Sequence, residues 1–184
     1  MAAGVHTLGV ISDTHGLVRP EALAALAGVE RIVHAGDIGS RAVLEALAAL
    51  KGVERIVHAG DIGNREVLDA LARVAPVTAV RGNNDRGAWA AGIPETEVVE
   101  VGGVSLYLLH DLHELDLEPR AAGFAAVISG HSHQPRLEDK DGVLYLNPGS
   151  AGPRRFKLPI SLARLTITHA RVSAKLVTLQ SFTG

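Results

Sequence analysis

EALAALAGVERIVHAGDIGSRAVL occupies residues 21–44, and EALAALKGVERIVHAGDIGNREVL follows it directly over residues 45–68. The two copies differ only at the pairs Ala27/Lys51, Ser40/Asn64 and Ala42/Glu66. Each copy contains the β-prone run RIVH between Ala/Leu-rich segments, so each copy predicts a strand between helices. Strands that alternate with helices at this spacing predict a mainly parallel sheet covered by helices.

The first half of the chain continues this alternation, whereas the second half is richer in strands. Pro20 suits the first turn of a helix, and Ser40 and Asn64 suit the N-caps of helices over residues 40–50 and 64–74. Gly102-Gly103 has the length of a two-residue hairpin turn. The strand-rich second half favours two facing sheets over one open sheet. Predicted strands cover residues 8–12, 31–34, 55–58, 77–80, 97–101, 104–109, 127–129, 142–146, 162–165 and 171–179.

Length and composition predict one domain over residues 1–184, with a core of Val, Leu, Ile and Ala. The chain is 47% hydrophobic, and its net charge of −2 gives no basic face for an obligate nucleic-acid partner. It has no cysteine, which excludes disulfides and thiolate metal sites. No apolar run reaches the length of a membrane span and no secretory signal opens the sequence, so we expect a cytoplasmic protein.

Polar side chains follow several predicted strands, and parallel strands deliver such residues to one edge of a sheet. Carboxylates, an amide oxygen and imidazoles without thiolates suit Mn²⁺, Fe or Zn²⁺ better than Ca²⁺. These donors exceed the needs of one catalytic ion, so we expect two divalent ions roughly 3.5 to 4 Å apart that share one carboxylate. The Gly-Asp turn is the expected source of the bridge, because glycine lets the backbone approach the ions. The residues are Asp13, His15, Asp37 in the first copy or Asp61 in the second, Asn83, His110, His131 and His133.

Taken in order, these motifs resemble those of the calcineurin-like metallophosphoesterase superfamily, and especially its small bacterial and archaeal phosphodiesterase branch. The resemblance covers nearly the whole chain. It implies a four-layer α/β/β/α fold, in which helices flank a sandwich of two sheets and the tandem repeat lies inside the domain. The matching positions are Asp13/His15, Gly36-Asp37 or Gly60-Asp61, Gly82 to Asp85, His110, Gly130/His131/His133 and Asn147 to Ser150.

The resemblance also implies roles for these residues. A hydroxide between the ions would attack phosphorus in line, so the expected function is hydrolysis of a small phosphate ester, above all a diester. Mn²⁺ is the preferred metal, with Ni²⁺, Fe, Zn²⁺ and Mg²⁺ as alternatives. Asp61, Asn83 and His110 form the expected catalytic set. One ion would be held by Asp13, His15, the Gly-Asp aspartate and His133, and the other by the same aspartate with Asn83, His110 and His131.

Some residues outside this set bear on the substrate. Asn84 stands where many members of the superfamily have a histidine, and an amide cannot protonate a leaving group, which favours substrates with good leaving groups. His113 is a candidate for a substrate-facing role. The pair Arg154 and Arg155 could bind a substrate phosphate or form only a solvated charged surface.

The repeat offers two aspartates, Asp37 and Asp61, for one bridging position. Placing both repeated strands side by side would move the strand before Asn83 outward by about 4.8 Å and pull this ligand off the metals. We therefore expect one copy to be displaced from the sheet. Asp61 is the favoured bridge, because it is joined without interruption to the strand before Asn83. A displaced strand has unpaired edges and could promote self-association.

Two other classes of function stay open. One is a metal-binding scaffold that resembles the retromer subunit of this fold, which serves as a protein-docking surface. That relative lacks the histidine of the D-x-H motif, whereas this chain has His15. The other is a domain whose site the repeat has disabled, because a fold alone does not imply its function.

Overall fold

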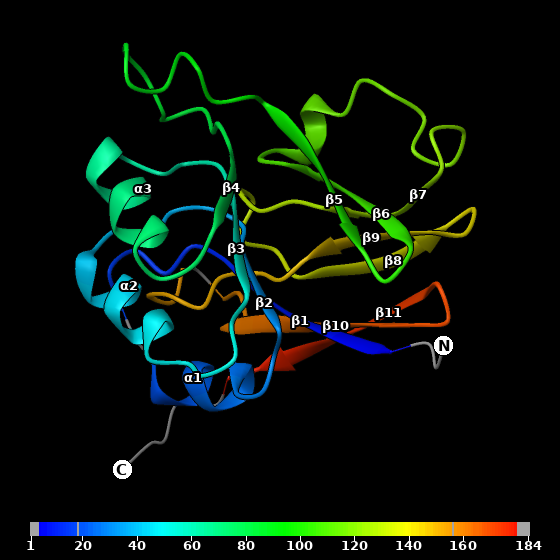
Figure 1. Ribbon diagram of the computed structural model, residues 1–184, viewed down its shortest axis with the longest axis horizontal. Helices are drawn as coiled ribbons and strands as arrows, with labels where there is room; N and C mark the ends of the chain where they lie inside the picture. Colours follow the sequence, from blue (N-terminus) through cyan, green and yellow to red (C-terminus); the bar gives the residue numbers. More distant parts are fainter. Residues whose placement is uncertain (1–3, 18, 156, 180–184) are drawn as a thin grey trace.

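Two mixed β-sheets pack face to face in the computed structural model, which describes residues 4–17, 19–155 and 157–179 (Figure 1). The six-stranded sheet contains, in spatial order, β11 (Arg171–Thr178), β10 (Ser161–Thr168), β1 (Val5–Ile11), β2 (Arg31–His34), β3 (Arg55–Ala59) and β4 (Val77–Val80). The five-stranded sheet contains β5 (Thr96–Val101), β6 (Val104–Leu109), β7 (Phe124–Ile128), β9 (Val143–Asn147) and β8 (Arg136–Lys140). The helices α1 (Pro20–Leu26), α2 (Arg41–Ala48) and α3 (Arg65–Ala72) cover the outer face of the six-stranded sheet (Figure 1). Among the described residues, no helix is both long and apolar enough to span a membrane.

Alternation of side chains along the strands builds two apolar layers. In the repeated strands, Ile32 and Ile56 pack with the helices, while Val33 and Val57 pack against the five-stranded sheet. The predicted two-sheet α/β fold is therefore confirmed. One layer differs from the expected four: within the described residues, the short 3₁₀ turn η1 (Leu112–Glu114) and the loop after it pack on the outer face of the five-stranded sheet, where an α-helix was expected.

Both copies of the repeat lie in one sheet as parallel neighbours. Each residue of β2 pairs with the equivalent residue of β3, from Arg31 with Arg55 to His34 with His58. β1 pairs with the other side of β2, and β4 pairs with the other side of β3, so both repeated strands are paired on both sides. The prediction that one copy is displaced is wrong. Neither repeated strand therefore has the unpaired edge that was expected to promote self-association.

The sheet accepts the extra strand because the repeat supplies a helix with it. α2 and α3 each follow a repeated strand and bury apolar side chains, among them Leu44, Leu47 and Leu71. The expectation of displacement considered the added strand alone. A strand with its covering helix brings its own buried apolar surface, which offsets the cost of ordering the added residues.

Local signals at the turns and caps are mostly as predicted. The Gly102-Gly103 turn joins β5 to β6, with positive φ at both glycines. Asn64 caps α3 by accepting a hydrogen bond from the backbone N–H of Val67 at 3.0 Å. Ser40 occupies the equivalent position before α2 but makes no side-chain cap bond, because its hydroxyl donates to the carbonyl of Gly16.

The loop after β4 packs closely on the loop after β3. A Cβ built on Gly82 would lie 2.1 Å from the backbone nitrogen of Asp61 and 2.2 Å from its Oδ1. The close approach lets one buried carboxylate hold both loops, because Asp85 accepts hydrogen bonds from the backbone N–H groups of Gly63 and Gly82 at 2.9 Å each. The loop after β4 thus packs on the turn that follows β3, the strand of the second copy.

We expect Gly82→Ala to destabilise the fold by roughly 2–4 kcal/mol, because the new methyl group overlaps backbone that can move only by breaking the Asp85 bonds. Gly92→Ala is the matched control, since a Cβ there meets no atom of the described residues within 4 Å. We expect the control to change stability by less than about 0.5 kcal/mol. Urea unfolding measures both values, and equal midpoints for the two variants would contradict the packing of these loops.

A stacked pair of buried histidines, one from each copy, joins β2 and β3. The ring centroids of His34 and His58 are 5.3 Å apart, and both residues are fully buried. His34 Nε2 lies 3.1 Å from Thr14 Oγ1, whereas neither ring nitrogen of His58 has a hydrogen-bond partner among the described residues. Burial lowers the pKa of His34 well below its usual value and lowers the pKa of His58 to about 4. Both rings are therefore neutral at pH 7.

Acid should weaken the fold through His58. The unfolded chain protonates this side chain near its ordinary pKa of 6.5, but the folded chain does so only near 4. Its contribution to stability is complete above pH 6.5 and is lost as the pH falls toward 4, a change of up to roughly 3 kcal/mol. His58→Leu should remove this part of the pH dependence in urea unfolding from about pH 7.5 to about pH 4.5. The exposed His113→Leu should keep the wild-type slope; parallel curves for wild type and His58→Leu would refute the assignment.

Candidate metal centre

The loops that follow β1, β2 and β3 stay in register beyond the ends of the strands. The backbone N–H of Asp13 donates to the carbonyl of Gly36 at 2.8 Å, and that of His15 donates to the carbonyl of Asp37 at 2.9 Å. The N–H of Asp37 donates in turn to the carbonyl of Asp61 at 3.1 Å. The three turns therefore extend the hydrogen-bond ladder of the sheet, which fixes the height at which each carboxylate leaves it.

Most of the predicted ligands have a left-handed backbone. This conformation is uncommon outside glycine and concentrates at functional sites, although Asp, Asn and His tolerate it best. Asp37 and Asp61 adopt nearly the same φ, so both copies of the repeat form the same turn. The residues concerned are Asp13 (φ 52°), His15 (44°), Asp37 (52°), Asp61 (49°), His131 (63°) and His133 (58°).

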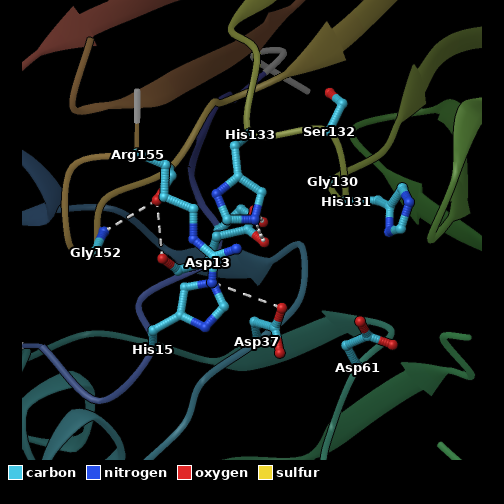
Figure 2. A network of polar contacts seen from close by, with 12 residues as sticks. Asp13, His15, Asp37, Asp61, Gly130, His131, Ser132, His133, Gly152 and Arg155 are labelled. Carbon is cyan, nitrogen blue, oxygen red and sulfur yellow. Dashed lines mark hydrogen bonds and ion pairs between the residues drawn. The ribbon is translucent and has the colours of Figure 1, made fainter. Parts of the chain in front are cut away.

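The first group of donors consists of Asp13, His15, Asp37 and His133, which point toward one another in Figure 2. One ligand atom from each of the four lies within 4.8 Å of the others. Asp13 Oδ1 lies 3.0 Å from His133 Nε2, and His15 Nε2 lies 3.7 Å from Asp37 Oδ2. Asp13 is fully buried, and its Oδ1 accepts no conventional hydrogen bond among the described residues. A buried carboxylate oxygen in this state is costly, and a divalent cation between it and the imidazoles would satisfy it.

The second group consists of Asp61, His110 and His131, with Asn83 beside it. His110 Nε2 lies 3.3 Å from Asp61 Oδ2, 3.2 Å from His131 Nδ1 and 3.1 Å from Asn83 Oδ1. His110 Nδ1 lies 2.9 Å from the carbonyl oxygen of Ala59, which can only accept, so Nδ1 carries the donated proton. Nε2 is thereby directed at the group, an arrangement typical of metal-binding histidines.

Neither aspartate belongs to both groups. Asp37 lies in the first group and Asp61 in the second, and Figure 2 shows Asp61 and His131 to one side of the first group. The sequence predicts one bridging carboxylate, from either copy, and the structure places one aspartate in each group. The physical reason is the added strand, which shifts the second Gly-Asp turn by one strand position.

The two aspartates have identical neighbours in sequence but opposite pKa shifts. Burial raises the pKa of Asp37, and the nearby carboxylates Asp61 and Asp13 add to this effect, while His15 opposes it. Burial acts in the same direction on Asp61, but hydrogen bonds with His110 and Asn84 outweigh it and lower the pKa. The pKa of His110 shifts the other way: burial lowers it, but the pairing with Asp61 raises it overall. Asp61 and His110 thus stabilise each other's charged forms in the second group.

The imidazole in the first group behaves differently. Burial lowers the pKa of His15, although the carboxylate of Asp37 opposes this effect. A neutral imidazole presents a lone pair to a metal, so this residue is ready to coordinate near neutral pH.

Several residues that support the site were not singled out from the sequence. Asp85 joins two of its loops, as described above. Asn147 donates from Nδ2 to the carbonyl of Gly130 at 2.6 Å, which steadies the loop that carries His131 and His133. Asp85 and Asn147 lie within the matched motifs Gly82 to Asp85 and Asn147 to Ser150. Their place in these motifs could have indicated a supporting role at the site.

The residues considered for the substrate lie outside the two groups. Asn84 instead binds Asp61, with its backbone N–H 2.9 Å from Oδ1 and its Nδ2 2.6 Å from Oδ2. His113 is exposed and pairs with Asp111. Arg155 is exposed, and its Nη2 lies 3.2 Å from His15 Nε2, so it reaches over the first group (Figure 2).

Comparison with known proteins gives a consistent result. A sequence profile of the calcineurin-like phosphoesterase superfamily domain matches residues 7–54 and again residues 40–170, and each match contains a different copy of RIVHAGD. A probable metallophosphoesterase from Methanocaldococcus jannaschii is 30% identical over 190 residues, which cover 96% of this chain and 83% of the relative.

Solved structures share the fold. An archaeal phosphodiesterase superposes with a TM-score of 0.70 at 21% identity, over 94% of this chain and 99% of the other. Zinc-bound wild-type Vps29 from Entamoeba histolytica superposes with a TM-score of 0.55 at 23% identity, over 94% and 98% of the two chains. Profile, relative and fold agree, and the chain belongs to the calcineurin-like phosphoesterase superfamily.

Proposed function

We propose that this protein is a metal-dependent phosphodiesterase that uses two divalent ions, preferably Mn²⁺, to hydrolyse small phosphate diesters. The observation that carries the proposal is the buried Asp13 Oδ1, which accepts no conventional hydrogen bond among the described residues and lies 3.0 Å from His133 Nε2, with a second cluster of oxygen and nitrogen donors next to it. Family membership supports the same reaction class. We also propose that the chain acts as one domain in the cytoplasm, without an obligate nucleic-acid partner.

The proposed ligand sets follow the two groups. Oxygen and imidazole donors without sulfur fit Mn²⁺, and also Ni²⁺, Fe, Zn²⁺ or Mg²⁺. When bound, the ions would supply the Lewis acidity that activates water and neutralises charge on the phosphate. The first ion would be held by Asp13, His15, Asp37 and His133, and the second by Asp61, Asn83, His110 and His131.

The protein's own side chains hold the donor atoms in place and determine which leaving groups can depart. The Nδ1–H of His110 donates to the carbonyl of Ala59, so the ring cannot turn away from the reacting centre. Asn84 is engaged with the carboxylate of Asp61 and has no acidic proton to give. Leaving groups must therefore depart with little help from the protein, which favours diesters with acidic alcohols or phenols.

The surroundings of the two groups suit an anionic ester. Arg155 lies over the first group and would meet a phosphate oxygen bound there. Beside the second group lies a cavity of about 600 Å³, lined among others by Asp111, Ser132, Arg136 and Asn147. It has room for the substituent that stays on phosphorus when a diester is cleaved, a group that a monoester lacks.

The function is tested with bis-p-nitrophenyl phosphate, using metal-stripped protein to which Mn²⁺, Ni²⁺, Zn²⁺ or Mg²⁺ is returned. We expect turnover only after metal is returned, fastest with Mn²⁺, and slower cleavage of the monoester p-nitrophenyl phosphate. Asp13→Asn should lose about a hundredfold or more in activity, because it weakens a buried metal ligand while keeping the side-chain shape. Circular dichroism checks that the variant is folded.

A metal-binding scaffold is the second candidate, favoured by the likeness to zinc-bound Vps29. A third is a domain disabled by the repeat, which the separation of Asp37 from Asp61 makes worth testing. Folded protein that binds metal but turns over no phosphate ester would support the scaffold. Folded protein that binds no metal would support the disabled domain, and either result would refute the phosphodiesterase.

Arg155→Ala should raise KM for the diester by about five- to tenfold with a smaller effect on kcat, because a single charge-assisted hydrogen bond to phosphate is lost. Arg154→Ala is the matched control, since Arg154 is an exposed neighbour of the same charge. Arg155→Lys should recover part of the loss. Initial rates over a range of substrate concentrations measure the change, and equal KM values for the two alanine variants would assign both arginines to the solvated surface.

A further inference from the structure

We propose that the tandem repeat has divided the work of one bridging carboxylate between Asp37 and Asp61, so that the two ions occupy separate sites without a shared carboxylate. The inference rests on the proposed metal centre and concerns the residues in which this chain departs from a one-copy sequence. It assigns a ligand role to both aspartates, one in each group.

The repeated strands set the relation between the two Gly-Asp turns. β2 and β3 are adjacent, parallel and paired at equivalent residues, so the two Gly-Asp turns are related by a shift of one strand, about 4.8 Å. The hydrogen bond from Asp37 N to the carbonyl of Asp61 carries this relation into the turns, and their φ angles of 52° and 49° agree. Two carboxylates shifted in this way lie side by side, as Figure 2 shows, and each has its own nearest imidazole.

Asp61 is already held by several contacts. Its Oδ1 accepts from the backbone N–H of Asn84, and its Oδ2 accepts from Asn84 Nδ2 and lies 3.3 Å from His110 Nε2. Asn84 follows β4, which pairs with β3 on the side away from β2, and His110 follows β6 of the other sheet. The contacts of the carboxylate therefore direct it toward the second group.

Asp37 lies beside an imidazole of the first group. Its Oδ2 lies 3.7 Å from His15 Nε2, and His15 follows β1 on the other side of β2. Asp37 thus faces the first group, where Asp13 and His133 complete the set. Each aspartate is drawn toward different partners, and neither lies within 4.8 Å of all the donors of both groups.

The two sites should differ in affinity. The first group offers two carboxylates and two imidazoles, whereas the second offers one carboxylate, two imidazoles and the amide oxygen of Asn83. An ion in the second group must also compete with the hydrogen bonds that Asp61 accepts from Asn84, whereas Asp13 Oδ1 in the first group accepts no conventional hydrogen bond among the described residues. Ions should therefore fill the first site before the second.

The test uses Mn²⁺ alone, with metal-stripped full-length protein and no substrate. Equilibrium dialysis counts the bound ions, and electron paramagnetic resonance reports whether they share a bridge. We expect two ions with affinities that differ by about tenfold or more. The hyperfine pattern of isolated Mn²⁺ should appear at one ion per chain, and filling the other site should broaden it through the nearby spin without exchange coupling. An exchange-coupled pair in the wild-type protein would overturn the proposal, and this reading requires no variant to fold.

The variants assign the sites. Asp37→Asn should lose the tighter ion and keep the weaker one, while Asp61→Asn should lose the weaker ion and keep the tighter one. Asp141→Asn is the matched control, because Asp141 has the same left-handed φ in an exposed turn outside both groups, and it should bind both ions. The proposal is overturned if one variant loses both ions and the other keeps both, since that pattern identifies a single bridge.

Binding and turnover separate this inference from the proposed function. Two separate ions without hydrolysis of any diester would uphold the divided site and refute the phosphodiesterase. Hydrolysis of a diester by an exchange-coupled pair would uphold the phosphodiesterase and refute the divided site.

Discussion

The structure depends on the residue-for-residue pairing of β2 with β3. This register carries the two Gly-Asp turns out of the sheet at the same height and keeps them hydrogen bonded to each other. A slip of one residue would turn Val57 toward the helices and Ile56 toward the second sheet, since side chains alternate between faces. The same slip would turn the second aspartate away from His110. One pairing therefore sets both the apolar layers and the positions of the metal donors.

Backbone strain at the centre is supported by the same ladder. A left-handed conformation costs on the order of 1 kcal/mol for a residue other than glycine. Several such residues gather here, and the hydrogen bonds that join the turns after β1, β2 and β3 hold them in place. Donors that are fixed before an ion arrives need little rearrangement on binding, which is how a strained loop contributes to affinity.

The positions of the candidate ligands along the chain could be predicted, because each follows an apolar run that ends in a polar residue. Their division into two groups could not, since it depends on which strands are neighbours. The displaced copy was wrongly expected because the ligands were treated as one fixed cluster; in the structure the cluster divides and the sheet stays continuous. β8 gave no signal, because all five residues of RLEDK are exposed and only pairing with β9 makes them a strand.

In the language of symmetry, the repeat is a translation by one strand, and the rest of the chain breaks that symmetry. Asp37 and Asp61 share the same preceding residues, the same turn and nearly the same φ. Their pKa values nevertheless move in opposite directions, because one faces His15 and the other His110 and Asn84. The molecule thus places one local sequence in two different surroundings. The acidity of the aspartate in each copy is set by the side chains around it and not by the segment that contains it.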